Sequence, residues 1–96
     1  MRFRIPPNAG TPFQRRVWRL ASAIPRGEVR TYGWMARKLR SSPRAVGQAL
    51  KVNPFAPRVP CHRVVSSDGT AGGFAGRARS MRKVRMLAKE GLEFAP

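Results

Sequence analysis

The feature that most constrains the fold is a helix-start signal that occurs twice, a hydroxylated residue followed directly by proline. Thr11-Pro12 forms the first signal, and Gln14 stands where a capping box has its second member. Ser42-Pro43 forms the second signal. The hydroxyl can accept a hydrogen bond from a free amide of the first turn, and proline suits a first position that needs no amide. The chain is therefore expected to be mainly helical, with little or no strand.

Apolar residues recur at helical spacing after these signals and in two further segments. The spacing predicts helices over about residues 12–24, 32–39, 43–52 and 81–90, the last of them capped by Ser80. Each helix has a stripe expected to face inward: Phe13, Val17, Trp18, Leu20, Ala21 and Ile24; Met35, Ala36 and Leu39; Val46, Ala49 and Leu50; and Met81, Val84, Leu87 and Ala88.

The second and third helices stand close together along the chain. Thr31 is the expected cap of the second helix, and Arg40-Ser41-Ser42 is a tight turn that leads to the third. Two short helices joined by such a turn are typical of a helix-turn-helix, whose second helix is the recognition element in DNA-binding proteins. Paired helices with a polar turn are also common in small all-helical domains. We expect a small, winged-helix-like helical domain.

The charge of the chain favours an anionic partner. Twenty Lys and Arg residues against four Asp and Glu residues give a formal net charge of +16 over 96 residues. Self-repulsion at this charge is large, and a polyanion relieves it. Most of the cations are arginines, whose planar guanidinium suits bidentate phosphate contacts and stacking on bases. Double-stranded DNA is the expected partner, and a membrane surface is the lesser candidate.

Composition also excludes several classes of protein. A single cysteine, Cys61, excludes an internal disulfide, and a single histidine with four carboxylates leaves too few ligands for a metal centre. We therefore expect neither a metal nor a cofactor. No apolar stretch is long enough to cross a membrane, and residues 1–10 lack a secretion signal. We expect a cytoplasmic monomer, nucleoid-associated if prokaryotic, with a basic lead-in over residues 1–10 and one domain over residues 11–96.

The only cysteine and the only histidine of the chain are neighbours, in Pro60-Cys61-His62-Arg63. A thiol with a base beside it is the minimal arrangement for nucleophilic catalysis, although a lone cysteine can also be an inert core residue. The positive charge of His62, Arg63 and the whole chain is expected to favour the thiolate. Residues 59–65 are expected to form a short buried segment. Neighbours in an extended segment point to opposite sides, so contact between the two side chains requires a turn or a bridging water.

The motif V-P-C-H-R-V-V at residues 59–65 resembles the active site of O6-alkylguanine-DNA alkyltransferases, also called methylated-DNA–protein-cysteine methyltransferases. The resemblance extends over about residues 11–91 in six stretches that keep their order and nearly their spacing. The stretches are T-P-F-Q-x-x-V-W (11–18), I-P-x-G-x-V-x-T-Y-G (24–33), R-A-V-G-x-A (44–49), N-P (53–54), P-C-H-R-V-V (60–65) and E-G (90–91). The resemblance implies DNA repair by stoichiometric, single-turnover transfer of the alkyl group from guanine O6 in duplex DNA to Cys61, after base flipping.

The resemblance implies a role for each matching residue. Cys61 resembles the alkyl acceptor, and His62, oriented by Glu90, resembles the base that deprotonates it through a water. Asn53 resembles the residue that braces the motif, and Tyr32 the tyrosine that donates a proton toward guanine N3. The remaining site residues are, on the DNA side, the finger arginine Arg44 with Tyr32, Gly47, Gln48 and Lys51, and, in the base pocket, Val64, Phe74, Ala75 and Gly76.

Two other hypotheses stay open. Alkyltransferase-like proteins share this domain and often lack its N-terminal partner, but they replace the cysteine and act as lesion-binding flags. The short chain fits that class, and Cys61 argues against it. A basic helix-turn-helix protein that binds DNA as an architectural element would explain the charge. That hypothesis leaves Cys61, His62 and Tyr32 without a role.

Overall fold

The fold is built from short helices, as the cap signals predicted. A computed structural model describes residues 4–72 and 81–95. The elements among them are α1 (Pro12–Ser22), β1 (Arg30–Thr31), α2 (Tyr32–Leu39), α3 (Pro43–Lys51), the 3-10 turn η1 (Cys61–Arg63), β2 (Val64–Val65) and α4 (Met81–Lys89). The strands hold two residues each. The expectation of a mainly helical domain with little strand is confirmed.

Three helices begin where side-chain caps satisfy their first amides. The Thr11 hydroxyl accepts a hydrogen bond from the Gln14 amide at 3.1 Å, and the Gln14 side chain accepts one from the Thr11 amide at 2.9 Å. The hydroxyls of Thr31 and Ser42 each accept from the amide three residues further on. The first helix ends at Ser22, earlier than predicted. Pro25 disfavours a helical conformation at Ile24, the residue before it, so the helix cannot extend to that position.

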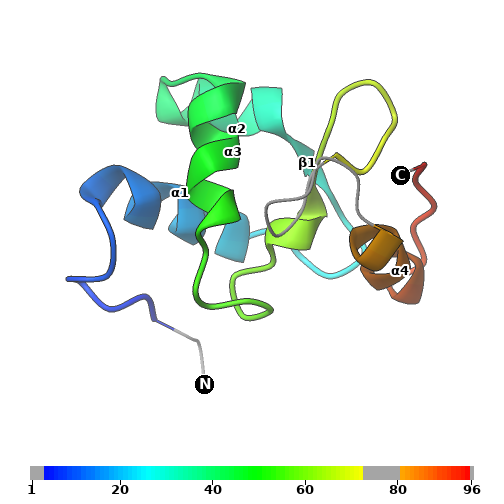
Figure 1. Ribbon diagram of the computed structural model, residues 1–96, viewed down its shortest axis with the longest axis horizontal. Helices are drawn as coiled ribbons and strands as arrows, with labels where there is room; N and C mark the ends of the chain where they lie inside the picture. The colour runs from blue at the N-terminus through cyan, green and yellow to red at the C-terminus, as the bar shows by residue number, and fades with distance from the viewer. Residues whose placement is uncertain (1–3, 73–80, 96) are drawn as a thin grey trace.

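Helices α1, α2 and α3 pack around one apolar core. Figure 1 shows α3 in front, with α1 and α2 behind it. The Trp18 indole Nε1 donates a hydrogen bond to the carbonyl of Ala49 at 2.9 Å, which joins α1 to α3 inside the core. The buried side chains that these helices contribute are Val17, Trp18, Ala21, Met35, Ala36, Leu39, Val46, Ala49 and Leu50.

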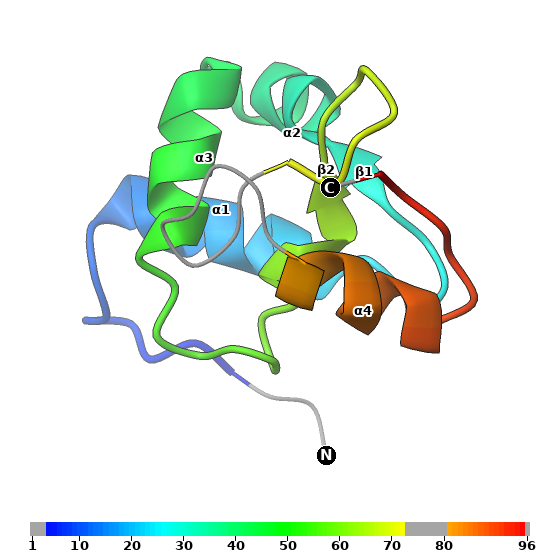
Figure 2. The same cartoon turned by 45° about the vertical axis from the view of Figure 1, so that its right-hand side comes forward.

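A two-stranded parallel sheet joins the first half of the domain to the second. Arg30 in β1 pairs with Val64 in β2, and Thr31 pairs with Val65 (Figure 2). The pairing joins the start of α2, where Tyr32 lies, to the segment that carries the cysteine motif, and each strand is only two residues long. Two-residue strands have no alternating pattern to reveal them, so the sequence did not predict this pairing.

Helix α4 buries only part of the predicted stripe, with Leu87 in the core and Val84 packed against it. Met81 is 50% exposed and Ala88 is exposed, so the expected buried stripe is wrong at both positions. Leu87 is fully buried, and Lys83, four residues before it, is fully buried as well. The lysine takes an inward position because its long stem is apolar and its ammonium group finds acceptors in the interior. The predicted cap, Ser80, lies outside the described residues.

Part of the expected lead-in contacts the domain. Ile5 and Ala9 pack against the main core, and the Arg15 guanidinium donates hydrogen bonds to the carbonyls of Ala9 and Gly10 at 3.0 and 2.9 Å. Within residues 4–72 and 81–95, no helix has the length and apolar character needed to cross a membrane.

Candidate active site

Cys61 and His62 lie in a turn, which is one of the two arrangements that contact between them required. Residues 61–63 form the 3-10 turn η1, and the Arg63 amide donates to the carbonyl of Pro60 at 2.9 Å. The segment is buried as predicted, with Cys61 8% and His62 4% exposed. Both side chains are therefore held in the interior, at the point where α4 packs against η1.

Burial dominates the ionisation of Cys61. It raises the pKa of the thiol above the usual value, while the hydrogen bond from Asn53, the charge of Lys83 and nearby backbone groups lower it. The expectation that His62, Arg63 and the net charge keep this residue as a thiolate is therefore wrong. The Arg63 guanidinium is paired with the Glu90 carboxylate, and the net charge of the chain is spread over an exposed surface. Neither outweighs the desolvation of the thiol itself. The resting thiol is protonated at neutral pH and needs a base before it can react.

Glu90 connects the turn to the C-terminal end of α4. Its Oε2 lies 2.8 Å from His62 Nε2, and Arg63 donates from Nε and Nη2 to its two oxygens, each at 3.0 Å. These contacts, with Arg63 the largest contributor, lower the pKa of Glu90 from 4.5 to about 2. An ionised carboxylate can only accept hydrogen bonds, so His62 Nε2 is the donor in this pair. The other ring nitrogen, Nδ1, is then the one that can take up a proton.

Asn53 ties the end of α3 to the cysteine motif. Its side-chain Nδ2 donates to the carbonyl of Val59 at 2.9 Å, and its Oδ1 accepts from the amide of Phe55 at 2.9 Å. A hydrogen bond from the same side chain is one of the influences that lower the pKa of Cys61. Asn53 therefore holds the loop before the motif and also contacts the thiol.

Tyr32 and Lys83 form the other side of the site. The Lys83 ammonium donates to the Tyr32 hydroxyl at 3.1 Å and to the carbonyl of Val64. Burial, together with the charge of Cys61, raises the pKa of Tyr32 to about 12. Burial lowers the pKa of Lys83 to about 8, and the thiolate of Cys61 opposes that shift. At neutral pH the site thus holds a protonated phenol beside a lysine that is still largely charged.

Sequence reasoning missed Lys83. It lies in a helix rich in Lys and Arg, where a charge is usually solvated, and no motif marks it. The one signal that could have found it is its spacing, because a residue four positions before a buried leucine shares that leucine's face.

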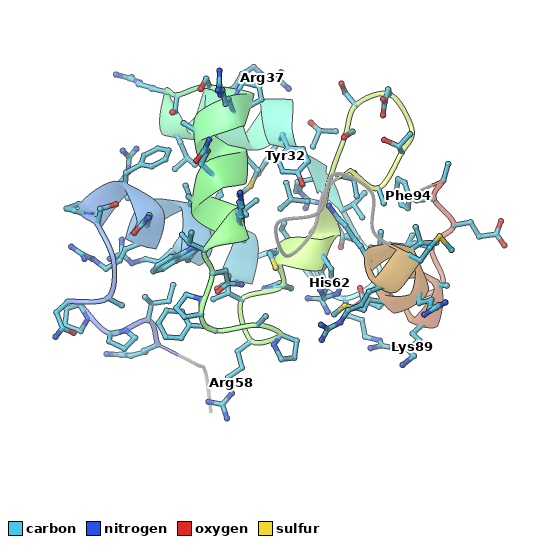
Figure 3. All side chains as sticks on the ribbon, in the orientation of Figure 1. Tyr32, Arg37, Arg58, His62, Lys89 and Phe94 are labelled. Atoms are coloured by element: carbon cyan, nitrogen blue, oxygen red, sulfur yellow. The ribbon has the colours of Figure 1, made fainter. Side chains whose placement is uncertain are left out.

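Four of the five predicted DNA-side residues lie on α3, and the fifth, Tyr32, is the first residue of α2. Arg44, Gln48 and Lys51 are exposed, and Gly47 is half-buried. A Cβ at Gly47 would lie 3.9 Å from the Tyr32 ring, so the helix passes beside that ring. Figure 3 shows Tyr32 between α3 and the turn that carries His62. In the predicted base pocket, Val64 is buried with its carbonyl toward Lys83, whereas Phe74, Ala75 and Gly76 lie outside the described residues.

Three comparisons with known proteins agree with this geometry. Residues 12–92 match the family described as 6-O-methylguanine DNA methyltransferase, DNA binding domain. The methylated-DNA–protein-cysteine methyltransferase of Methanothermobacter thermautotrophicus is 46% identical over 82 residues, which are 85% of this chain and 46% of that relative. The Mycobacterium tuberculosis OGT in complex with DNA has 43% identity and a TM-score of 0.77, covering 85% of this chain and 50% of that one. The Schizosaccharomyces pombe Atl1 in complex with damaged DNA containing O6-carboxymethylguanine has 37% identity and a TM-score of 0.73, covering 84% and 77%.

Fold and site together define a class, a helix-turn-helix domain with a buried cysteine beside a histidine–carboxylate pair. Within that class, the chain belongs to the 6-O-methylguanine DNA methyltransferase DNA-binding-domain family. The resemblance seen in the six sequence stretches is confirmed. The chain spans about half the length of the curated relatives it matches.

Proposed function

We propose that this protein repairs DNA by transferring an alkyl group from guanine O6 to Sγ of Cys61, once per molecule. The observation that carries the proposal is the buried Cys61 thiol with the His62–Glu90 pair, 2.8 Å between Nε2 and Oε2, beside it. Relatives at 46–48% identity are named methylated-DNA–protein-cysteine methyltransferases, which supports the same chemistry here.

The step requires a base because the resting thiol is protonated. His62 takes the thiol proton through a bridging water, and the ionised Glu90 stabilises the imidazolium that forms. The sulfur then attacks the alkyl carbon, so an S–C bond forms as the C–O bond to guanine breaks. The product thioether has no route back to a free thiol, which makes the protein a single-turnover reagent.

Tyr32 supplies the proton that lets guanine leave as a neutral base. The Lys83 ammonium donates to the phenolic oxygen, and the proton of the hydroxyl is the one that Tyr32 gives to guanine N3. A pKa of about 12 keeps that proton in place until the leaving group develops negative charge. Lys83 then stabilises the Tyr32 phenolate. Solvent carries the proton that His62 took from the thiol to this phenolate and restores both side chains.

The DNA side of the reaction requires the lesion to leave the duplex. Guanine O6 lies inside the base stack, and flipping the nucleotide costs roughly a few kcal/mol. Arg44, exposed in the first turn of α3, takes the place of the flipped nucleotide in the stack. Helix α3, with Gly47, Gln48 and Lys51, binds the minor groove, where base readout is degenerate and suits damage in any sequence. The net charge of +16 supplies affinity that does not depend on sequence.

A repair assay on the DNA strand tests this proposal. A duplex with one O6-methylguanine is incubated with increasing protein, digested to nucleosides and analysed for the remaining lesion. We expect one lesion lost per protein molecule, no loss with Cys61→Ser, and unchanged loss with the surface control Arg85→Gln. Lesion loss that continues beyond one per molecule, or that persists in Cys61→Ser, would contradict the proposal.

Lesion binding without chemistry is a second candidate function. The similarity to S. pombe Atl1, of which this chain covers 77%, favours it, since that structure holds damaged DNA. The same assay separates the two when binding is measured in parallel. Selective binding of the damaged duplex with no lesion loss would identify a lesion-binding flag, and binding that ignores the lesion would identify an architectural DNA binder.

A further inference from the structure

A second group of cations lies between α1 and α2. Arg16, Arg19 and Lys38 are exposed and line a shallow groove, which we call the α1–α2 surface. Among the described residues, no ion pair involves any of the three. The groove is completed by Leu20, Ala23 and Leu39.

The α1–α2 surface faces away from the recognition helix. In a bundle of three helices, the groove between two of them opens on the side opposite the third, and Figure 1 shows α3 in front of α1 and α2. The side chains of α1 agree with this. Trp18 points to the Ala49 carbonyl in α3, while Arg16, about 200° around the helix, reaches the Leu39 carbonyl at the end of α2.

An aromatic ring extends the surface along α2. The ring centroid of Trp34 lies 5.5 Å from the Lys38 ammonium and 5.4 Å from the Arg30 guanidinium. These cation–π contacts hold both cations near the indole. A lysine that is already positioned loses less side-chain entropy when it binds a phosphate.

Charge, rather than apolar area, is what this surface offers to a partner. Leu39 is only 8% exposed and Leu20 is half-buried, so the apolar area that the groove exposes is small compared with that of a protein-binding site. Unpaired exposed cations beside an aromatic ring suit the phosphate backbone of nucleic acid. The surface therefore fits a DNA duplex better than it fits a protein helix.

We propose that the α1–α2 surface binds a second DNA duplex while α3 holds the first, so that the protein passes directly from one duplex to another. The inference rests on the proposed function only in assigning the first duplex to α3. A protein that reacts once has to search much undamaged DNA before it meets a lesion, and direct passage removes the need to dissociate fully between segments.

Direct transfer has a kinetic signature. A labelled, undamaged duplex is bound to the protein and chased with increasing concentrations of unlabelled duplex in a stopped-flow instrument. If the chase duplex binds before the first leaves, the release rate of the label rises with chase concentration. If the protein must first dissociate, the release rate stays constant.

Two matched double variants locate the surface. Arg19→Gln with Lys38→Gln alters the α1–α2 surface, and Arg85→Gln with Lys89→Gln alters exposed positions on α4. Each variant removes two of the sixteen net positive charges. We expect the rise with chase concentration to be lost in the first variant and retained in the second, with lesion removal and circular dichroism unchanged in both.

Three outcomes would overturn the inference. One is a constant release rate for the unaltered protein, and another is an equal rise in both double variants. The third is binding of polyglutamate, but not of a second duplex, to the α1–α2 surface, which would assign that surface to an acidic protein. A failure of the proposed alkyl transfer would appear separately, because the lesion would remain in the DNA. The release rates from undamaged duplexes could still be interpreted.

Discussion

Glu90 has a charge that the fold itself maintains. Arg63 donates to both oxygens of Glu90, so this carboxylate stays ionised between pH 4.5 and about 2, where an ordinary carboxyl group is protonated. The consequence for the site is a fixed orientation of His62. The consequence for the fold is that its unfolding free energy depends on the ionisation of Glu90, and therefore on pH.

The stability of the fold in acid should depend on Glu90. The pKa of Glu90 is lowered from 4.5 to about 2, so its contribution to stability is complete above pH 4.5 and is lost as pH falls toward 2. Glu90→Gln should therefore flatten the dependence of the unfolding free energy on pH between 4.5 and 2. Urea denaturation at several pH values measures this. The exposed control Glu93→Gln should keep the steep dependence, and an equally steep curve for Glu90→Gln would refute the role of this carboxylate.

The charged form of buried Lys83 destabilises the fold, whereas the charged form of Glu90 stabilises it. The pKa of Lys83 falls from 10.5 to about 8 on burial, so the unfolded chain holds this proton more tightly than the folded one. The unfolding free energy should therefore rise as pH increases above about 8. We expect that rise with Lys83 in a Cys61→Ser background, where the thiol cannot titrate, and its loss in Lys83→Met. Lys89→Met serves as the exposed control, and identical slopes in all three proteins would show that Lys83 is not desolvated.

Arg44 is expected to act only when the lesion lies in a duplex. Arg44→Ala should slow repair of double-stranded DNA while leaving the reaction with free O6-benzylguanine nearly unchanged, because a free base needs no replacement in a stack. Both rates are measured as alkylation of Cys61 over time, with Arg85→Ala as the surface control. Equal losses on the two substrates would show that Arg44 supports the site rather than opening the duplex.

At the scale of elements, the caps decide where helices begin. Ser42 starts α3 by accepting a hydrogen bond from the Ala45 amide at 3.1 Å. Ser42→Ala should cost about 1 kcal/mol of stability, measured by urea denaturation. Ser42→Asp should keep the cap and restore that stability, but it places a carboxylate two residues before Arg44 and should weaken duplex binding in fluorescence anisotropy. An aspartate variant that binds DNA as tightly as the unaltered protein would remove the start of α3 from the interface.

Local signals predicted the elements better than they predicted what the elements bury. Thr11, Thr31 and Ser42 marked the helix starts because a cap is formed by residues close in sequence. The pairing of β1 with β2 and the burial of Lys83 could not be predicted, since both depend on segments distant in the chain. In the candidate site, Cys61 and His62 were found as the only cysteine beside the only histidine, whereas the role of Glu90 came from a resemblance. The ionisation of Cys61 was predicted with the wrong sign because counting charges ignores desolvation.

At the scale of the whole molecule, the site joins parts of the chain that are far apart. Its members come from the start of α2, the loop after α3, the turn η1 and both ends of α4, and they are Tyr32, Asn53, Cys61, His62, Lys83 and Glu90. The net charge of +16 does not ionise the thiol, because charges on an exposed surface are screened over roughly 8–10 Å while burial acts at the atom itself. The role proposed for this charge is instead to bind DNA, on α3 and on the α1–α2 surface.

The central claim is that Cys61 receives the alkyl group, and the mass of the protein tests it most directly. The protein is incubated with a duplex that carries O6-methylguanine. Its intact mass is then measured by mass spectrometry, and the modified residue is located by peptide mapping. We predict the added mass of one methyl group in place of one hydrogen, located on Cys61 and absent from Cys61→Ala. An unchanged mass on a damaged duplex that the protein binds selectively, or a methyl group on any other residue, would contradict the account.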